Sequence, residues 1–337
     1  MTGSPAAHAA ATGPAATIFF GSGSFAVPIL EALLALPSVR VVGVVTAPDR
    51  PAGRRAAMTA TPVARAARGH KLALLQPASL RDPEAVGAIG ALQPDLGVLA
   101  DYGRIVPQAV LDLPAHGFLN VHPSLLPRHR GAAPIPGVIL AGDTRTGVTI
   151  IRMDAGLDTG PIVASESFLL DGKEVAPEVE ARAAAIGAKL LSAVVPRWLA
   201  GAIAPLPQDD AAATMTRPLR REDGRLAPNV SALELERRVR ALQPWPGAWF
   251  ELVGGREAGD RVAVLRAAVA PPRIGDVAAT LVDDDGGIAI STGSGRLRLL
   301  EVQPAGGRPM SSEAWLRGRP GLLGASVEFR AMRGGGP

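Results

Sequence analysis

The sequence predicts an α/β protein: a Rossmann-like, mostly parallel sheet covered by helices, followed by a small C-terminal antiparallel β-barrel of the oligonucleotide-binding (OB) kind. Short apolar runs alternate with helical patterns from residue 17 to about residue 200, which is typical of βαβ units. Periodicity is lost from about 201 to 225, where Pro, Ala and charged residues dominate. Beyond residue 225, short alternating runs are divided by Asp- and Gly-rich turns, which favours antiparallel strands.

The first half is expected to begin with two strands around a helix. Residues 17–21 (TIFFG) and 40–46 (RVVGVVT) are apolar runs of strand length, and 24–36 has the apolar spacing of a helix. Another helix is expected over 82–92, where Asp82 can cap the first turn. The later expected elements are strands over 94–100, 117–122, 147–153 and 161–170, and helices over 133–142 and 175–201. In such a sheet a ligand is expected beyond the carboxyl ends of the strands.

The second half is expected to start with one helix over 231–242. Ser231 and Glu234 have the spacing of a capping box, and Pro244 ends the helix. The strands expected after it span 248–253, 261–269, 278–282, 287–292 and 296–303. The expected domain boundaries are a disordered N-terminal extension (1–16), a catalytic domain (17–203), a linker (204–225), a C-terminal OB-like domain (226–330) and a tail (331–337).

Composition excludes several classes of protein. No apolar run approaches the roughly 20 residues of a membrane helix, and residues 1–16 lack the basic and apolar regions of a signal peptide. We therefore expect a cytoplasmic protein that does not bind membranes. The absence of cysteine excludes disulfides, thiolate metal sites and a cysteine nucleophile. Five histidines without paired spacing indicate that there is no metal site.

One segment is strongly basic although the net charge of the chain is only +4. Residues 40–81 contain eight Arg or Lys side chains and a single acid, Asp49. A segment of this kind is either a phosphate-binding patch or a solvated face.

A glycine pattern follows the first expected strand. Gly21-x-Gly23-x-x-Ala26, between a strand and a helix, matches the short form of a dinucleotide-binding fingerprint. That fingerprint also needs an acidic residue at the end of the second strand, whereas Thr46 stands there and Asp49 comes only after a proline. The glycines are therefore interpreted as allowing close approach of the backbone to a ligand or a neighbouring strand.

The densest chemical pattern is residues 117–135, GFLNVHPSLLPRHRGAAPI. Asn120 and His122 are two residues apart near the end of an expected strand, so their side chains share one face. Pro123 ends that strand and starts a loop at the edge of the sheet where a ligand is expected. These two side chains are therefore candidates for an active site.

A second segment, 152–162, places Asp154 and Asp158 in a glycine-punctuated loop that can return a carboxylate to the imidazole. An amide, an imidazole and a carboxylate in one pocket suit acyl transfer to an amine without a covalent enzyme intermediate. Asn120 would donate to the developing oxyanion, and His122 would move the proton of the amine or polarise the carbonyl. Asp158 would orient the imidazole and hold its charged form.

Each of these residues also has a purely structural interpretation. A lone histidine at the end of a strand is often packed or hydrogen-bonded, and Asn or Asp alone is common in turns. His116 and His129 are given this structural role. Ser124 lacks the flanking glycines of a nucleophile elbow.

Residues 120–135, followed by 141–163 (AGDTRTGVTIIRMDAGLDTGPIV), resemble the catalytic core of the 10-formyltetrahydrofolate-dependent formyltransferases. The Asn-x-His and Asp signature of this family falls on Asn120, His122 and Asp158. The resemblance implies the formyltransferase fold and a catalytic role for these three residues. It also implies 10-formyltetrahydrofolate as co-substrate, without a metal. The residues implied to bind the folate are Ser124, Leu125, Leu126 and Pro127, and Tyr102, Gly103, Ile105, Val106 and Pro107.

Other regions resemble the family members that act on initiator methionyl-tRNA. They are the basic stretch 46–55 (TAPDRPAGRR) and two stretches of the C-terminal domain, 242–250 and 297–321. The residues implied to contact this tRNA are Arg50, Arg54 and Arg55 at the acceptor arm and Arg220 and Arg221 at the phosphate backbone, with solvated charge as the alternative for the latter two. The sequence after Arg54 lacks the usual glycine and lysines of the family, so the RNA contacts of this loop are expected to be fewer or shifted.

The resemblance therefore implies a monomeric enzyme that transfers a formyl group from 10-formyltetrahydrofolate to the α-amine of methionyl initiator tRNA. Formyl transfer to an amino-sugar nucleotide is the alternative activity, and a non-catalytic RNA-binding relative is the alternative class. An NAD-dependent enzyme is the least favoured interpretation.

Overall fold

The computed structural model describes residues 13–52, 57–253 and 259–327. These residues form two compact units. The first contains the chain up to residue 132, 145–168 and 180–216, and the second contains 133–144, 169–179 and the chain from 217 onward. The expected domain boundaries stay a prediction, because a compact unit need not fold on its own. The predicted tail and most of the predicted N-terminal extension lie outside the described residues.

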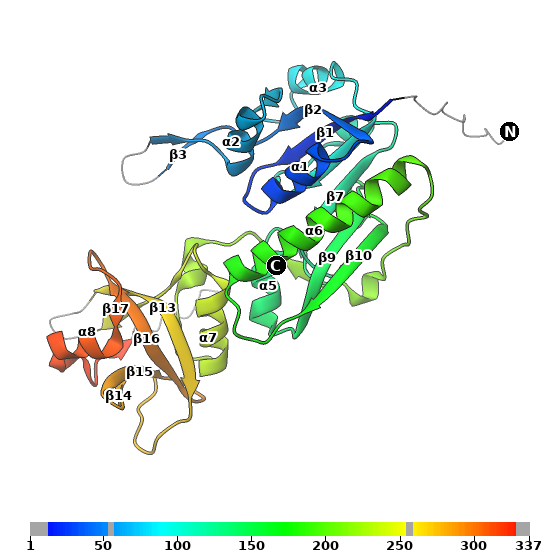
Figure 1. Ribbon diagram of the computed structural model, residues 1–337. Coiled ribbons are helices and arrows are strands. Elements are labelled where there is room, and N and C mark those ends of the chain that lie inside the picture. The colour runs from blue at the N-terminus through cyan, green and yellow to red at the C-terminus, as the bar shows by residue number, and fades with distance from the viewer. Residues whose placement is uncertain (1–12, 53–56, 254–258, 328–337) are drawn as a thin grey trace. The chain divides into compact units, whose positions relative to one another are not determined.

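The first unit is built on a seven-stranded sheet with the order β10-β9-β7-β6-β1-β2-β5 (Figure 1). The strands are β1 (Ala15–Gly21), β2 (Val39–Val45), β5 (Leu74–Leu75), β6 (Leu96–Ala100), β7 (Phe118–His122), β9 (Arg145–Arg152) and β10 (Ile162–Leu169). Strand β1 pairs in parallel with β2 and β6, and β6 pairs in parallel with β7. Strand β9 runs antiparallel to β7. The expected Rossmann-like, mostly parallel sheet is confirmed.

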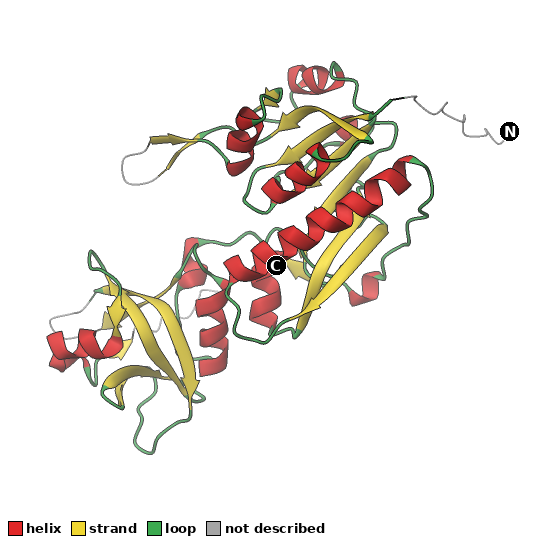
Figure 2. Cartoon of the chain, in the orientation of Figure 1, coloured by secondary structure: helices red, strands yellow, loops and turns green. Residues whose placement is uncertain are grey.

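Helices alternate with these strands along the chain (Figure 2). They are α1 (Ala26–Leu34), α2 (Pro62–Gly69), α3 (Pro83–Gly90), α4 (Gln108–Leu111) and α6 (Ala176–Leu199). Asp82 caps α3 as expected, since its carboxylate accepts from the backbone N–H of Glu84 at 3.0 Å. The elements missed at the sequence level are short. In the first unit they are the hairpin of β3 (Arg50–Ala52) and β4 (Ala57–Thr59), helices α2 and α4, strand β5, the parallel pair of β8 (Arg130–Gly131) and β11 (Met215–Thr216), and the 3₁₀ turn η1 (Asp210–Ala212).

Strand β1 lies in the core of the first unit, which explains its continuous apolar sequence. Every residue of β1 is buried, as expected for a central parallel strand covered on both faces. The Phe20 ring lies edge-on to Tyr102 and Phe118, with centroids 5.4 and 5.3 Å apart. These contacts join β1 to the start of β7 and to the segment that follows β6.

The glycine pattern after β1 serves close approach, as interpreted from the sequence. A Cβ on Gly21 would lie 2.9 Å from the carbonyl oxygen of Ala100, and one on Gly23 would fall 1.7 Å from Oδ2 of Asp101. The backbone N–H groups of Ser22 and Gly23 both donate to the carbonyl oxygen of Asp101. The turn therefore fastens β1 to β6.

The second unit contains an antiparallel sheet with the order β14-β15-β16-β13-β12-β18, with β17 paired to β16. Its elements are α5 (Pro134–Ala141), η2 (Arg221–Gly224), α7 (Ala232–Ala241), β12 (Ala248–Val253), β13 (Arg261–Ala270), β14 (Leu281–Asp284), β15 (Gly287–Ser291), β16 (Arg296–Pro304), β17 (Met310–Ser311), α8 (Ser312–Gly318), η3 (Pro320–Leu322) and β18 (Ser326–Val327). A bridge between Thr280 and Ser326 joins the two ends of the sheet. The expected small antiparallel barrel is thus confirmed as a curled sheet.

Helix α7 begins at the capping box expected from the sequence. The Ser231 hydroxyl accepts from the N–H of Glu234 at 3.2 Å, and the Glu234 carboxylate accepts from the N–H of Ser231 at 3.0 Å. The apolar face of α7, including Leu235 and Val239, is buried in the core of this unit together with Phe250. In the part of the chain that the structure describes, no helix is long and apolar enough to cross a membrane.

Candidate active site

The candidate site lies at the carboxyl end of β7. Asn120 and His122 are 6% and 5% exposed, respectively, and alternate with Val121 on the strand. Because the side-chain period of a strand is two residues, their side chains lie on the same face. The structure therefore brings the amide and the imidazole together as expected.

Asp158 reaches this face from the loop between β9 and β10. Its Oδ1 accepts from Nδ2 of Asn120 at 3.0 Å, and its Oδ2 accepts from the backbone N–H of Gly131 at 2.8 Å. The same Oδ2 is 3.6 Å from Nδ1 of His122. Asp158 has φ of 56°, in the left-handed region that Asp tolerates better than most residues. The three predicted catalytic side chains therefore meet at one point.

The proton on the neutral His122 ring is placed by one hydrogen bond. Nε2 is 2.9 Å from the carbonyl oxygen of His129. A carbonyl oxygen only accepts, so Nε2 carries the proton and donates. In the neutral ring Nδ1 then has the free lone pair, on the side of Asp158. The site thus presents a proton acceptor with a carboxylate beside it.

The second candidate carboxylate, Asp154, has a structural role. Its Oδ1 accepts from the N–H of Gly156 at 3.0 Å and from the Thr159 hydroxyl at 2.7 Å. These bonds shape the loop that carries Asp158. Gly160 fits closely in the same loop, because a Cβ there would lie 1.9 Å from the carbonyl oxygen of Arg152.

Two further side chains that support Asp158 were missed at the sequence level. Nε2 of Gln208 donates to the carbonyl oxygens of Asp158 and Gly160 at 2.8 and 2.7 Å. Arg130 donates to Oε1 of Gln208 from Nε and Nη2, at 3.0 and 2.8 Å. Gln208 belongs to the stretch without periodicity that was interpreted as a linker, so no local signal marked it.

The loop after β7 is held by a buried threonine. The Thr149 hydroxyl donates to the carbonyl oxygen of Ser124 at 2.7 Å and accepts from the N–H of Leu126 at 3.1 Å. The Ser124 side chain is buried, and its hydroxyl donates to the carbonyl oxygen of Arg128 at 2.7 Å. This bonding agrees with the absence of a serine nucleophile. Leu125 and Pro127 are half-buried in the same loop.

The second predicted folate segment follows β6, the neighbour of β7 in the sheet. Tyr102 and Val106 are buried, whereas Ile105 is 74% exposed. Gly103 is exposed with φ of 71°, a conformation that favours glycine. Pro107 immediately precedes α4. The two predicted folate segments thus start from adjacent strand ends.

Asp101, at the end of β6, is an unusual acid. Its side chain lies against Gly23, which has no Cβ to exclude it. Asp101 as a whole residue is exposed, but protein atoms crowd its carboxyl; this desolvation raises its pKa to about 7, and the negative charge of Glu180 adds to the shift. Glu180 itself accepts from the Ser24 hydroxyl at 2.5 Å.

The predicted tRNA-binding arginines fall in different places. Arg50 lies on β3, exposed, in the first unit, and Arg54 and Arg55 lie outside the described residues. Arg220 and Arg221 are exposed at η2 in the second unit. The second unit adds a cation–π stack missed at the sequence level, in which the guanidinium carbon of Arg261 is 3.5 Å from the ring centroid of Trp249.

Within residues 13–52, 57–253 and 259–327, no group of three or more His, Asp or Glu side chains is arranged to hold a metal ion.

Family models match most of the chain. The formyl transferase model matches residues 15–195, and the model of the formyl transferase C-terminal domain matches residues 218–320. A methionyl-tRNA formyltransferase of Chloroflexus aurantiacus is 47% identical over 303 residues, 89% of this chain and 96% of that protein. One from Halorhodospira halophila is 47% identical over 313 residues, 92% of this chain and 98% of that protein.

Solved structures share the fold at lower identity. An N-formyltransferase of Helicobacter canadensis, in complex with folinic acid and dTDP-3-aminofucose, has a TM-score of 0.61 and 15% identity. The match covers 84% of this chain and 98% of that one. HypX of Aquifex aeolicus in complex with tetrahydrofolic acid has a TM-score of 0.56 and 15% identity, over 90% of this chain and 47% of that chain.

Proposed function

Since this chain belongs to the methionyl-tRNA formyltransferase family, we propose that Asn120, His122 and Asp158 carry out its reaction. The chain is an enzyme that transfers a formyl group to the α-amine of methionyl initiator tRNA, with a folate co-substrate. We propose 10-formyltetrahydrofolate as the donor. The observation that carries this assignment is the meeting of an amide, an imidazole and a carboxylate at the end of β7.

The reaction starts when the amine attacks the formyl carbon. A C–N bond forms, and the carbonyl oxygen becomes an oxyanion. Nδ2 of Asn120 has two N–H groups, and one of them donates to Asp158, so the other is available to the oxyanion. A fixed donor of this kind is worth roughly a hundredfold or more in turnover.

His122 handles the proton. Because Nε2 is bound to a carbonyl oxygen, Nδ1 accepts the proton that the attacking amine loses. Asp158, 3.6 Å from Nδ1, stabilises the resulting imidazolium. When the bond from the formyl carbon to N10 of the folate breaks, the same proton passes to N10. The products are tetrahydrofolate and the formylated aminoacyl-tRNA.

The folate is proposed to lie along the two segments that leave the adjacent strand ends. These are the loop of Ser124, Leu125, Leu126 and Pro127 and the segment of Tyr102, Gly103, Ile105, Val106 and Pro107. The first begins at the end of β7 and the second at the end of its neighbour β6, so a ligand along them would have its reactive end near His122. The Thr149 bonds that hold the first loop support this arrangement.

Arg50, Arg54 and Arg55 are proposed to bind the acceptor arm of the tRNA, and Arg220 and Arg221 its phosphate backbone. The exposure of Arg50, Arg220 and Arg221 supports this proposal, because phosphate contacts require accessible guanidinium groups. We also propose that the enzyme acts as a monomer in the cytoplasm, where its acceptor is charged. Light scattering of the purified protein tests this, because a monomer has a mass of 34.6 kDa.

The assay is formyl transfer from 10-formyltetrahydrofolate to methionyl initiator tRNA. His122→Ala is expected to lose about 10²–10⁴-fold in turnover, the usual contribution of a general acid–base. His116→Ala is the matched control, because His116 precedes the opposite end of β7, and it is expected to keep full turnover. A folded His122→Ala enzyme with near-normal turnover contradicts the assignment. Formylation of an amino-sugar nucleotide but not of methionyl-tRNA would show that the proposed acceptor is wrong.

A further inference from the structure

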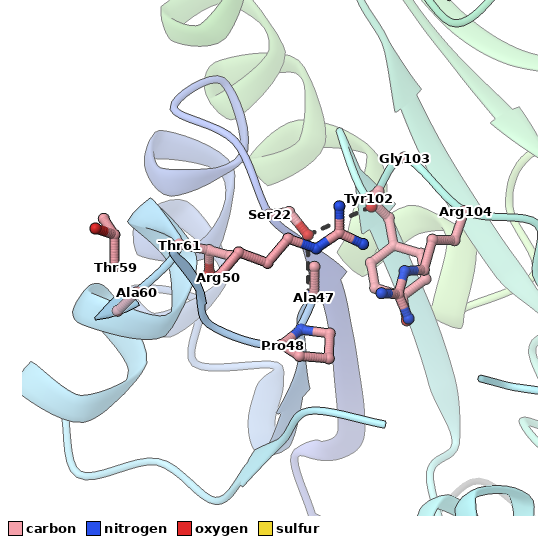
Figure 3. A pocket seen from close by; sticks show the side chains of 10 residues that line it. All are labelled: Ser22, Ala47, Pro48, Arg50, Thr59, Ala60, Thr61, Tyr102, Gly103 and Arg104. Carbon is pink, nitrogen blue, oxygen red and sulfur yellow. Dashed lines mark hydrogen bonds between the residues drawn. The ribbon is translucent and has the colours of Figure 1, made fainter. Parts of the chain in front are cut away.

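A pocket of about 300 Å³ opens at the carboxyl edge of the first unit's sheet, apart from the catalytic side chains (Figure 3). Its walls come from the ends of β1, β2 and β6 and from the β3–β4 hairpin. The lining residues are Ser22, Ala47, Pro48, Arg50, Thr59, Ala60, Thr61, Tyr102, Gly103 and Arg104. None of them belongs to the catalytic trio, so the pocket needs its own explanation.

The pocket is cationic. None of its ten lining residues is acidic, and two of them are arginines. In Figure 3 the Arg50 side chain extends across the pocket toward Ser22 and Tyr102. Among residues 13–52, 57–253 and 259–327, its guanidinium has no hydrogen-bond or ion-pair partner. An arginine that faces a pocket and has no partner in it is suited to bind an anion.

Neighbouring groups keep this charge available. Asp49 precedes Arg50 in the chain, but its carboxylate accepts from Gln76 Nε2 at 2.7 Å and from Arg68 Nη2 at 3.2 Å. The Arg104 guanidinium is fixed on the other wall, because its Nη1 donates to two backbone carbonyl oxygens at 2.9 Å each.

The rest of the lining consists of small hydroxyl and apolar residues. Ser22 and Thr61 are fixed by bonds inside the protein: the Ser22 hydroxyl donates to the carbonyl oxygen of Tyr102 at 3.3 Å, and Thr61 accepts from the N–H of Ala64 at 3.0 Å. Ala47, Pro48 and Ala60 add an apolar surface. A volume near 300 Å³ is at the low end for ligand pockets, so it fits one nucleotide unit and not a longer stretch of RNA.

The position of the pocket matches a substrate that must also reach His122. In the sheet, β7, β6, β1 and β2 are consecutive neighbours. Neighbouring strands are about 4.8 Å apart, so β2 is roughly 14 Å from β7. A group bound between the ends of β1 and β2 can therefore present an attached aminoacyl ester to the end of β7.

We propose that this pocket binds the 3′-terminal nucleotide of the acceptor strand, with its phosphate between Arg50 and Arg104 and its base against Pro48. This inference rests on the proposed function, because it specifies where that substrate binds. It adds Arg104, Pro48 and Ser22 to the acceptor site. The carboxylate tail of the folate, which is also an anion, is the competing occupant, since Tyr102 and Gly103 belong to the proposed folate segment as well.

The test uses Arg50→Ala, with Arg50→Lys to restore charge without the planar fork. Arg40→Ala is the matched control, because Arg40 is an exposed arginine at the opposite end of β2. The probe is adenosine 5′-monophosphate, with adenosine as the ligand that lacks phosphate, titrated by saturation-transfer NMR. Arg50→Ala is expected to weaken binding of the monophosphate roughly tenfold and to leave adenosine unchanged. The affinity of Arg50→Lys for the monophosphate is expected to lie between those of the wild type and Arg50→Ala. The affinity of Arg40→Ala is expected to equal that of the wild type.

Kinetics then separate the possible occupants. For Arg50→Ala, the KM for methionyl-tRNA is expected to rise roughly tenfold, and the KM for 10-formyltetrahydrofolate is expected to stay the same. A rise in the folate KM instead, or displacement of the monophosphate by folate alone, would overturn the proposal and assign the pocket to the folate tail. Unchanged binding and kinetics in Arg50→Ala, with active wild type, would also overturn it. A wild type that binds the monophosphate through Arg50 but forms no formylated tRNA would overturn the proposed function and leave the nucleotide pocket standing.

Discussion

Asp158→Asn is expected to separate the charge of Asp158 from its shape. The substitution keeps the size of the side chain and removes the negative charge 3.6 Å from Nδ1 of His122. It also replaces one of two acceptor oxygens by an NH₂ group. Either the amide of Asn120 or the N–H of Gly131 then loses its acceptor, since each bonds a different oxygen.

The magnitude follows from the distance. Two unit charges 3.6 Å apart attract by about 4–5 kcal/mol at an effective dielectric constant of about 20. In the proposed mechanism the imidazolium exists only after the amine has lost its proton, so this attraction lowers the barrier and not the binding energy of the substrates. Each 1.36 kcal/mol is tenfold in rate. Asp158→Asn is therefore expected to lose about a thousandfold in kcat.

Single-turnover formyl transfer, measured with both substrates saturating, gives this number directly. Thermal unfolding shows whether the variant is folded. Asp154→Asn is the control, because Asp154 is a carboxylate of the same loop that bonds Gly156 and Thr159 instead of the imidazole. A folded Asp158→Asn enzyme within tenfold of the wild-type rate would refute the electrostatic role of Asp158.

Three further predictions concern stability. Because the folded-state pKa of Asp101 is raised to about 7 from its ordinary 3.8, the folded protein binds a proton there that the unfolded chain releases. Wild-type stability is therefore expected to fall relative to Asp101→Asn as the pH rises from 4 to 7, measured by urea unfolding across that range; parallel pH profiles would contradict this. Asp284→Ala removes a carboxylate 3.0 Å from the buried guanidinium of Arg296 and is expected to cost about 3–5 kcal/mol. Asp285→Ala, which removes an exposed carboxylate, is expected to cost about 0–1 kcal/mol, and equal losses in denaturant titrations would count against the buried pair. Gly160→Ala places a methyl group against the carbonyl oxygen of Arg152 in β9. It is expected to lower the free energy of unfolding by about 1–3 kcal/mol and to lower formyl-transfer activity. A variant with wild-type activity and stability would show that the loop adapts to the methyl group.

The sequence alone was sufficient where local pattern and tertiary role coincide. The apolar runs of β1, β6 and β7 predicted a buried parallel sheet, because strands covered on both faces need apolar side chains throughout. The capping residues Asp82 and Ser231 marked the starts of their helices to the residue, since a cap is a contact between neighbours in the chain. Period-two spacing likewise placed Asn120 and His122 on one face.

The sequence did not indicate the short exposed hairpin of β3 and β4. Its strands have three residues each, too few for alternation to appear, and the segment looked only basic. That hairpin supplies one wall of the pocket around Arg50. Its role depends also on the ends of β1 and β6, which are far from it in the chain.

What the sequence determined is the set of reactive groups and the platform that bears them: an amide and an imidazole on one strand end, and an aspartate in a loop behind glycines. The sequence analysis already chose Asp158 over Asp154 as the partner of the imidazole, and the tertiary structure places Asp158 there, with Oδ2 3.6 Å from Nδ1 of His122. Only the tertiary structure decided which nitrogen of His122 is free to accept a proton, and that Gln208, 50 residues from Asp158, holds the loop in place. Contacts of this range depend on how the chain returns to the edge of the sheet, and no local pattern records that path.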